Sequence, residues 1–482
     1  MTVPADEILV AGRWQRGGGA PLECVDPATG EPIAVVHGAS AGDVGEAASA
    51  AWVAEWAALL PHERARVLAR VGDLIERDAE SLALLQTRNT GKALRETRAL
   101  VASAAATFRF YAAALETMET ALTPQRGPWL TMSVYEPVGV VGAITPWNSP
   151  IASDAQKIAP ALAAGNGVLL KPAEATPLVS LALARLVLEA GVPARLLSVL
   201  PGPGSVVGDA IVRHPAVGKV AFTGGTSTGR AIGRIAAEKV MPVTMELGGK
   251  SPTIVCPDAA AEQAVAGILY GIFSSSGQSC IAGSRIFLPE SRYAEFRDLL
   301  VAGASRLRMG PGTAADTQVA PLATFAHRDR VAALVDRARE EGARVLCGGE
   351  VPPSAGAYYP PTLLEGLSNS SKTCQEEIFG PVGVLLPYRD EEDLVAQAND
   401  TVYGLACGIW TADYRRAWRL ARRIEAGTVW INTYKQFSIS TPFSGRKESG
   451  LGVDKGREGI LGYLRQKSVY WGLDEAPLPW AG

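Results

Sequence analysis

The chain has 482 residues and a formal net charge of −3, with 46 basic and 49 acidic side chains mixed along its length. This mixture disfavours nucleic acid or an anionic membrane as the main partner. No apolar run reaches the ~18 residues of a transmembrane helix. Residues 1–7 lack the basic and apolar segments of a signal peptide, and the six cysteines form no CxxC pair, so we expect a cytoplasmic protein. The four histidines do not cluster, so no metal site is expected.

The first part of the chain predicts short strands followed by helices. Strands are expected at residues 8–14 and 33–36, which flank a turn at 26–30. Apolar residues then recur at helical spacing within 41–118, which indicates amphipathic helices. Residues 119–137 are polar and extended.

From residue 138 the chain alternates between strands and helices. Strands are predicted at 138–144, 167–170, 196–200 and 217–222, and helices at 152–164, 177–190 and 230–238. This β-α-β-α-β order predicts a doubly wound parallel sheet with ligands at the carboxyl ends of its strands. A second αβ unit begins near Met245, with a strand at 253–256 and a helix at 259–275.

One cysteine stands out by its neighbours. Cys280 is preceded by Gly277 and Gln278 and followed by Gly283 and Arg285. Glycines let backbone approach a substrate closely, and a reactive thiol has to be partly exposed. Taken alone, however, a free cysteine is more often a small buried side chain than a nucleophile.

Three glycine-rich segments are candidates for a phosphate-binding site. Residues 223–229 lie between a predicted strand and a predicted helix, where a phosphate can approach the helix N-terminus. Residues 202–208 have the wrong spacing for a dinucleotide fingerprint. A P-loop ending at Ser251 is rejected, because the first glycine it needs is Thr244.

Taken together, several motifs resemble the aldehyde dehydrogenase superfamily, in the family's order and over nearly the whole chain. They are Pro146-Trp147-Asn148, Lys171-Pro172-Ala173-Glu174, Phe222-Thr223-Gly224 with Gly229, Glu246-Leu247-Gly248-Gly249-Lys250, Gly277-Gln278-x-Cys280, Glu376-Glu377-Ile378-Phe379-Gly380-Pro381, Asn399-x-Thr401-x-Tyr403-Gly404-Leu405 and Pro442-Phe443-x-Gly445. The resemblance implies two doubly wound αβ domains, one Rossmann-like for the cofactor and one catalytic.

The resemblance also implies the chemistry. Cys280, as thiolate, attacks an aldehyde carbonyl, and the Asn148 amide with the Cys280 backbone N–H stabilises the oxyanion. After hydride transfer, Glu246 activates water to hydrolyse the thioester, which favours a free acid as product. Lys157 belongs to a proton relay in the family, and a solvated lysine is the alternative. Glu246 could instead be a salt-bridged structural acid, and Asn148 a turn residue between prolines.

For the cofactor, the resemblance implies NAD. A carboxylate at Glu174, beside Lys171, accepts from both ribose hydroxyls and repels a 2′-phosphate, so NADP is less favoured. The other positions carried over are Thr145, Pro146 and Trp147, then Pro172, Gly204 and Phe222, then Gly224, Gly225, Thr228 and Leu247, and finally Glu377 and Phe379. Phe379 could instead be ordinary core.

The chain departs from the family pattern at several positions. The family often has serine where Gly225 stands, and Asp454 replaces a longer carboxylate while the preceding arginine is lost. Ser149 stands where bulky aromatic residues are frequent, and Ser274, Ser276 and Ser279 replace larger or apolar residues around the nucleophile. These small polar residues predict a roomy pocket for a functionalised, cyclic or aromatic aldehyde rather than a simple alkanal.

The sequence leaves two alternative functions, a serine hydrolase and a non-catalytic protein. Residues 225–229 match the G-x-S-x-G pattern of serine hydrolases, with Ser227 as nucleophile and His327 as the only downstream histidine. A non-catalytic protein on the same fold is the second alternative, because fold does not determine function.

The resemblance finally implies a domain division and an assembly. The cofactor domain is expected at 1–118 and 138–247, and the catalytic domain at 248–446. Residues 119–137 and 447–482 are expected to form an oligomerisation arm and tail. Alternation at 468–471 suits an edge strand that pairs with another chain, so a homodimer or homotetramer is expected.

Overall fold

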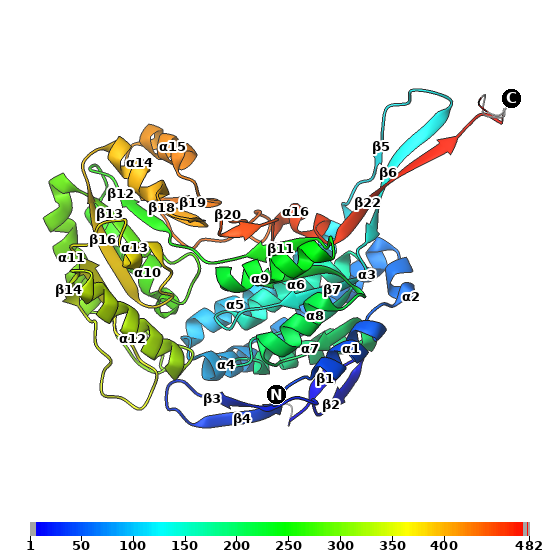
Figure 1. Cartoon of the computed structure of the whole chain (residues 1–482), viewed down its shortest axis with the longest axis horizontal. Helices are drawn as coiled ribbons and strands as arrows, with labels where there is room; N and C mark the ends of the chain where they lie inside the picture. Colours follow the sequence, from blue (N-terminus) through cyan, green and yellow to red (C-terminus); the bar gives the residue numbers. More distant parts are fainter. Residues whose placement is uncertain (1–5, 476–479, 481–482) are drawn as a thin grey trace.

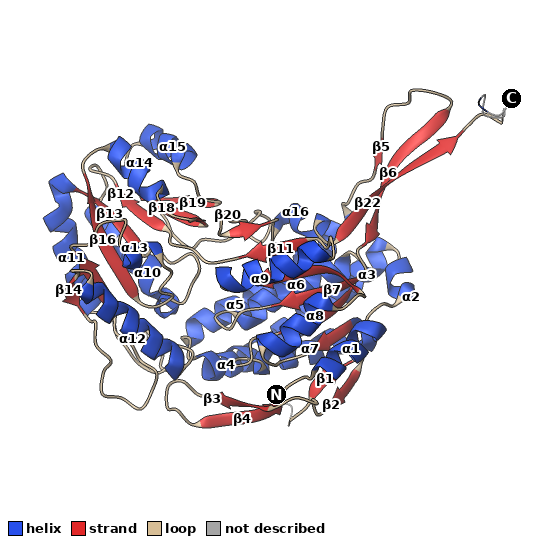
Figure 2. Ribbon diagram, viewed as in Figure 1, coloured by secondary structure: helices blue, strands red, loops and turns tan. Residues whose placement is uncertain are grey.

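The computed structural model describes residues 6–475 and residue 480. The molecule has two αβ lobes side by side, and a thin arm projects from one of them (Figure 1). Each lobe contains a mainly parallel sheet covered by helices (Figure 2). The predicted α/β fold with doubly wound parallel sheets is therefore confirmed.

The first lobe is built on an eight-stranded sheet with the order β2-β1-β9-β8-β7-β10-β11-β21. The central strands from β9 to β11 are parallel, whereas β1, β2 and β21 are antiparallel to their neighbours. The strands are β1 (Ile8–Val10), β2 (Arg13–Gln15), β7 (Val140–Ile144), β8 (Gly167–Lys171), β9 (Leu197–Val199), β10 (Val217–Thr223), β11 (Val243–Glu246) and β21 (Gly450–Leu451). Every residue of β7 and β8 is buried, because helices cover both faces of the sheet.

The helices of this lobe share one large apolar core with the sheet. They are α1 (Ala41–Ala50), α2 (Ala54–Ala58), α3 (Pro61–Arg77), α4 (Ala79–Thr90), α5 (Leu94–Glu116), α6 (Pro150–Ala163), α7 (Leu178–Glu189), α8 (Asp209–Arg213), α9 (Thr226–Glu238) and α16 (Gly456–Leu461), with short helical turns at Ala194–Leu196 and Gly204–Gly208. The long helix α5 packs against both α3 and α6.

The second lobe has a seven-stranded sheet with the order β14-β15-β16-β13-β12-β18-β19, parallel except for β14. Its strands are β12 (Pro252–Val255), β13 (Arg285–Pro289), β14 (Arg344–Cys347), β15 (Thr362–Glu365), β16 (Val382–Tyr388), β18 (Ala406–Trp410) and β19 (Thr428–Ile431). Val384 and Leu386 lie in one apolar cluster and Leu385 in another, so both faces of the sheet are buried.

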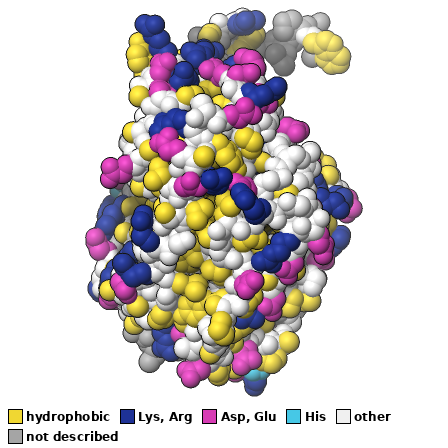
Figure 3. Space-filling model, turned by 90° about the vertical axis from the view of Figure 1, so that its left-hand side faces the viewer, with side chains coloured by type: hydrophobic (Ala, Val, Ile, Leu, Met, Phe, Trp, Pro, Cys, Tyr) yellow, Lys and Arg dark blue, Asp and Glu magenta, His cyan; other side chains and the backbone are white. Residues whose placement is uncertain are grey.

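The helices of the second lobe cover these two faces. They are α10 (Ala261–Phe273), α11 (Tyr293–Ser305), α12 (Phe325–Glu340), α13 (Lys372–Gln375), α14 (Glu391–Asn399) and α15 (Tyr414–Arg423), with 3₁₀ turns at Ser274–Gly277 and Glu290–Arg292. On the face of this lobe shown in Figure 3, acidic and basic side chains are interspersed.

The arm is a three-stranded antiparallel sheet of β5 (Ala121–Leu122), β6 (Trp129–Pro137) and β22 (Leu464–Gly472). It extends away from both lobes (Figure 1). The two remaining strand pairs are β3 (Pro21–Val25) with β4 (Pro32–His37), and β17 (Tyr403–Gly404) with β20 (Arg446–Lys447).

Three details of the strand and helix prediction are wrong. Residues 8–14 do not form one strand but the hairpin β1–β2, which turns at Ala11 and Gly12 with φ of +49° and +86°. The partner of β4 is β3, which was not predicted. Helix α9 begins four residues earlier than expected, at Thr226, immediately after the glycine pair.

Candidate active site

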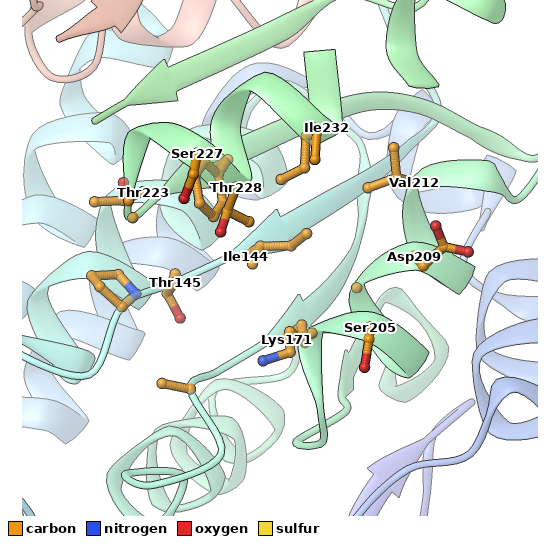
Figure 4. A pocket seen from close by; sticks show the side chains of 18 of the residues that line it. Ile144, Thr145, Lys171, Ser205, Asp209, Val212, Thr223, Ser227, Thr228 and Ile232 are labelled. Carbon is orange, nitrogen blue, oxygen red and sulfur yellow. The ribbon is translucent and has the colours of Figure 1, made fainter. Parts of the chain in front are cut away.

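A cavity of about 690 Å³ lies at the carboxyl edge of the first sheet. Figure 4 shows it between Thr228 and Ile232 of α9 on one side and Lys171 and Ser205 on the other. Its lining includes predicted cofactor positions from four separate segments: Thr145, Pro146 and Trp147 after β7, Lys171 and Glu174 at the end of β8, Gly204, and Phe222, Gly224, Gly225 and Thr228 around the start of α9. These segments meet because β7, β8 and β10 are parallel neighbours whose carboxyl ends share one edge.

Lys171 and Glu174 form an ion pair at this edge. Lys171 Nζ lies 3.0 Å from Glu174 Oε2 and also donates to the Pro172 carbonyl at 3.2 Å. The lysine is buried, whereas half of the Glu174 side chain is exposed toward the cavity opening. The carboxylate is thus held in place but can still accept hydrogen bonds from a ligand.

The N-terminus of α9 provides a site for an anion. Gly225 is its N-cap and offers no side-chain hydrogen bond to the first turn. A Cβ built at Gly225 would meet nothing within 4 Å, so the backbone N–H groups of that turn are open to the cavity. Together with the Lys171–Glu174 pair, this arrangement fits a diphosphate at the helix and a ribose at the carboxylate.

The sequence did not indicate the apolar part of this cavity. Val212 of α8, Ile232 and Ile235 of α9, and Ile144 at the end of β7 line it. Branched aliphatic residues at helical spacing are typical of core, so no signal distinguished these from their buried neighbours. They give this end of the cavity an apolar lining.

Glu377 and Phe379 lie beside the other end of the cavity rather than in its lining. The Phe379 ring packs edge-on against Trp147 with centroids 5.2 Å apart, and its backbone has φ of +60°. Glu377 Oε1 accepts from the Gly249 N–H at 3.0 Å, and burial raises the pKa of its carboxyl to about 7. Leu247 packs against Gly229 of α9, where a Cβ would lie 2.5 Å from its side chain.

Cys280 lies in a tight loop that follows α10. Ser275, Ser276 and Gly277 all have positive φ, and a Cβ at Gly277 would lie 2.0 Å from the Gly380 carbonyl oxygen. Only glycine fits there, which explains the glycine three residues before the thiol. Cys280 is partly exposed, unlike the buried Cys24, Cys256, Cys374 and Cys407.

Asn148 reaches the same loop from the first lobe. Its Nδ2 donates to the Gln278 carbonyl at 2.9 Å, two residues before Cys280. Burial raises the pKa of the Cys280 thiol to about 12, and the Glu377 and Glu246 carboxylates add to this effect while Lys435 opposes it. The thiol is therefore protonated in the free protein and needs help to ionise.

Glu246 is the last residue of β11 and is buried, with 4 % of its surface exposed. Neither of its carboxylate oxygens has a hydrogen-bond partner among the described residues. Burial, then the nearby Asp454 carboxylate, raises the pKa of Glu246 well above its usual value, against smaller opposite effects of Lys157 and Lys455. The salt-bridged structural acid considered from the sequence is thus wrong.

Lys157 is buried in α6, and its Nζ lies 3.2 Å from Asp454 Oδ2. The alternative of a solvated lysine is therefore wrong. The pair joins residues 297 positions apart, so no local pattern could have revealed it. It lies beside Glu246, on which both charges act.

Asp154 is a further residue that sequence reasoning missed. It is completely buried and accepts from the hydroxyls of Thr145 at 2.6 Å and Ser180 at 2.5 Å. These bonds fix the start of the loop that carries Trp147 and Asn148. The available signal was an acidic residue in a helix whose other residues are mostly apolar.

The serine hydrolase alternative lacks its base. Ser227 lines the cavity, but the His327 Nε2 lies 2.8 Å from the Phe379 carbonyl oxygen and must therefore carry the proton. In the described part of the chain, no hydrogen bond joins His327 to Ser227. This histidine instead packs edge-on against Trp147 at 5.0 Å.

Comparison with known proteins agrees with this geometry. The family model described as "Aldehyde dehydrogenase family" matches residues 14–469. The chain belongs to the aldehyde dehydrogenase family. A betaine aldehyde dehydrogenase of Cereibacter sphaeroides is 42 % identical over 482 residues, which is 99 % of each chain.

Solved aldehyde dehydrogenase structures have the same fold. The NAD⁺ complex of an aldehyde dehydrogenase from Bacillus cereus is 37 % identical, with a TM-score of 0.95 over 98 % of this chain and 97 % of that one. Betaine aldehyde dehydrogenase from Staphylococcus aureus, in complex with NAD⁺, is 33 % identical with a TM-score of 0.97, covering 99 % and 96 % of the two chains. The protein is thus an enzyme, as the sequence predicted.

The described residues contain no helix that is both long and apolar enough to cross a membrane. No group of three or more potential metal-ligating side chains occurs in that part of the chain either.

The buried carboxyl of Glu246 predicts a pH-dependent stability. Its pKa is raised in the folded state, so unfolding releases a proton above about pH 4.5 and the free energy of unfolding falls as pH rises. The Glu246→Gln side chain cannot ionise and does not show this loss. The melting temperature of the variant minus that of the wild type should therefore increase from about pH 5 to about pH 8. Thermal melts of both proteins across that range test this, with the exposed Glu448→Gln as control. A constant difference would contradict it.

Proposed function

We propose that this aldehyde dehydrogenase oxidises an aldehyde to the free carboxylic acid through a covalent intermediate on Cys280, with NAD as cofactor. The proposal rests on one convergence: the thiol, the Asn148 amide and the Glu246 carboxyl approach one another beside a cavity that fits a dinucleotide. Bound NAD would accept the hydride that the aldehyde carbon releases. Formation of NADH with a panel of aldehydes is the direct test, and a panel without any NADH would reject the proposal.

The first step needs a proton acceptor, because the thiol pKa is about 12. A carboxylate with a raised pKa, such as Glu246, is a stronger base than an exposed one and can take that proton. The sulfur then bonds to the carbonyl carbon, and the carbonyl electrons move to oxygen. Asn148 Nδ2 and the Cys280 N–H donate to this oxyanion in the tetrahedral thiohemiacetal. Its collapse releases the hydride and leaves a thioester.

The second step hydrolyses that thioester. Glu246 takes a proton from water as the water oxygen bonds to the acyl carbon, and the carbon–sulfur bond breaks to release the acid and the thiolate. Lys157 and Asp454 extend inward from Glu246 and can pass its proton on. The loss of one carbon in Asp454, relative to the family's longer carboxylate, leaves the ion pair with Lys157 formed.

We assign the cofactor contacts as follows. Lys171, Pro172 and Glu174 would hold the adenosine ribose, and Gly204, Phe222, Gly224, Gly225 and Thr228 the adenosine and diphosphate. Thr145, Pro146, Trp147 and Leu247 would flank the diphosphate, and Glu377 and Phe379 would contact the nicotinamide riboside.

Glu174 should favour NAD over NADP. A 2′-phosphate would face this half-exposed carboxylate, so Glu174→Gln should raise the NADP-to-NAD ratio of kcat/KM by roughly tenfold. Steady-state kinetics with both cofactors measure the ratio, and Glu189→Gln at the end of α7 serves as the control because it also removes an exposed, ion-paired carboxylate. An unchanged ratio would remove Glu174 from the specificity assignment.

Asn148→Ala should lower kcat by roughly 10²–10³-fold, the usual cost of removing one oxyanion donor. NAD binding, followed by fluorescence titration, should be retained, because the amide faces Gln278 rather than the cavity. A fall in cofactor affinity without a fall in kcat would make Asn148 a structural residue only.

The substrate should carry functional groups or a ring. Ser149 and Ser153 contact each other through their hydroxyls at 3.0 Å on the helix that follows Asn148, and Ser274 lies beside Lys435. These small hydroxylated side chains suit a functionalised, cyclic or aromatic aldehyde. The relatives named for betaine aldehyde show one functionalised substrate within the family.

We also propose a homodimer or homotetramer formed through the arm, with the domain division given from the sequence. In support, β22 lies at the edge of the arm sheet and exposes Tyr470 and Trp471. A cytoplasmic location remains a prediction from the sequence.

A further inference from the structure

Two lysines lie close to Cys280, and neither has a role in the mechanism above. Both Lys435 and Lys455 act electrostatically on the Cys280 sulfur. They come from the segment between β19 and α16, at positions where the family resemblance assigned no function. Both amino groups therefore lie near the thiol without a part in the steps described above.

Lys455 lies over an aromatic surface. Its Nζ is 3.9 Å from the centroid of the Phe437 ring and 5.4 Å from that of Phe443, and its backbone has φ of +60°. Phe443 packs in the same apolar cluster as Cys280, with Trp430 and Tyr434 beneath. The ammonium group is thus held over two aromatic rings, one of which packs against the same apolar cluster as Cys280.

Lys435 reaches the thiol loop from the other direction. Its Nζ donates to Ser274 Oγ at 2.7 Å and lies 3.4 Å from the Ser274 carbonyl oxygen. The titratable groups that face it are Glu96 in the first turn of α5, Lys92 just before that helix, and Cys280. Glu96 itself accepts from the Ser275 N–H at 2.7 Å, so its carboxylate is already engaged by the loop.

Neither ammonium group is neutralised by an ion pair. Within the described residues, no carboxylate lies within ion-pair distance of Lys435 or Lys455, whereas the buried Lys157 and the exposed Lys447 each pair with one. Burial lowers the pKa of Lys435 to about 7 and that of Lys455 to about 8. Hydrogen bonds to Ser274 and the ring faces beside Lys455 offset part of the cost of desolvating these groups, but no ion-paired carboxylate does.

We propose that Lys435 and Lys455 select an aldehyde that carries an anionic group, with a planar carbon frame seated on Phe437 and Phe443. This inference rests on the proposed aldehyde oxidation and names its substrate class. A carboxylate or phosphate on the substrate would supply the missing counter-charge for both lysines. A cationic aldehyde such as betaine aldehyde would meet two like charges instead, so this chain should differ in specificity from the relatives named for that substrate.

A different reading is that the two cations only lower the thiol pKa. In that case removal of the lysines would lower kcat/KM by the same factor for every aldehyde, because the thiol attacks all of them. Selection of an anion instead predicts a change in the ratio between charged and neutral substrates. The two readings are thus separated by the ratio and not by the rate.

The test compares 4-carboxybenzaldehyde with benzaldehyde, which differ only in the carboxylate. We expect kcat/KM to favour the acid by at least about tenfold in the wild type, and Lys435→Met or Lys455→Met to reduce that ratio by about tenfold. Lys372→Met, an exposed lysine at the start of α13, is the matched control and should keep the ratio. 4-Formylphenyl phosphate distinguishes a carboxylate site from a phosphate site, and preference for either anion supports the proposal.

A second measurement needs no turnover. Titration calorimetry should show that terephthalate, the product of the acid, binds the wild type more tightly than benzoate does, and that both lysine variants lose this difference. Equal kcat/KM for the acid and for benzaldehyde, a preference for betaine aldehyde, or ratios that survive both substitutions would overturn the proposal. The absence of NADH with every aldehyde would instead reject the aldehyde oxidation itself.

Discussion

Cys280→Ala should abolish aldehyde-dependent NADH formation, with a loss of at least about 10⁴-fold in kcat. The reason is that no other described thiol lies in this loop, and four of the other five cysteines are buried. Without the sulfur no thiohemiacetal forms, so the hydride has no tetrahedral carbon to leave from. The measurement is NADH absorbance with saturating aldehyde and NAD.

The control for this substitution is Cys347→Ala. Cys347 is the other partly exposed cysteine, but it lies in β14 on the far edge of the second sheet. It should keep its activity, and mass spectrometry of the wild type quenched during turnover should find the acyl group on Cys280 alone. Substantial activity in Cys280→Ala, or an acyl group on another residue, would contradict a covalent mechanism through Cys280.

Glu246→Gln should separate the two half-reactions. Acylation and hydride transfer can still occur, although more slowly, because the thiol loses its proton acceptor. Hydrolysis of the thioester should slow the most. The steady-state rate should fall by roughly 10²–10⁴-fold, the usual contribution of a general base. Rapid mixing should therefore show a burst of about one NADH per subunit, followed by a very slow phase, because the thioester accumulates.

The same experiment distinguishes a base from a structural acid. Adding a small thiol should release the trapped acyl group and restore turnover in Glu246→Gln, since a thiol can replace water as acceptor. Glu448→Gln, two residues before the strand that pairs with β11, should show no burst. A variant that turns over at the wild-type rate would exclude Glu246 as the base.

Local patterns predicted the parts of the site that are local. Strand–glycine–helix order at residues 217–238 predicted a helix that starts at this edge of the sheet, although α9 begins four residues earlier than expected. The motif around Cys280 predicted a candidate nucleophile, which lies in a tight, partly exposed loop. Parallel strands then bring their carboxyl ends together by necessity, so Thr145, Lys171 and Phe222 meet without any further information.

Pairings over long separations could not be predicted from residue spacing. The hydrogen bond from Asn148 to Gln278 spans 130 positions, and the Lys157–Asp454 pair spans 297. Both depend on how the two lobes and the C-terminal segment pack, which periodicity does not encode. The sequence did not single out Lys455 for the same reason. Its contacts with the Phe437 and Phe443 rings form only when the chain folds.

The strand β21 gives the site an unusual dependence on the end of the chain. Gly450 and Leu451 pair with Glu246 and Met245, so residues near the C-terminus complete the sheet edge that holds the proposed base. Because β21 is the outer partner of β11 in this sheet, a chain that ends before residue 450 would leave the strand of Glu246 at an open edge. We therefore expect truncation of the C-terminal segment to disturb the surroundings of Glu246 even though the thiol loop and most of the cavity lining come from earlier residues.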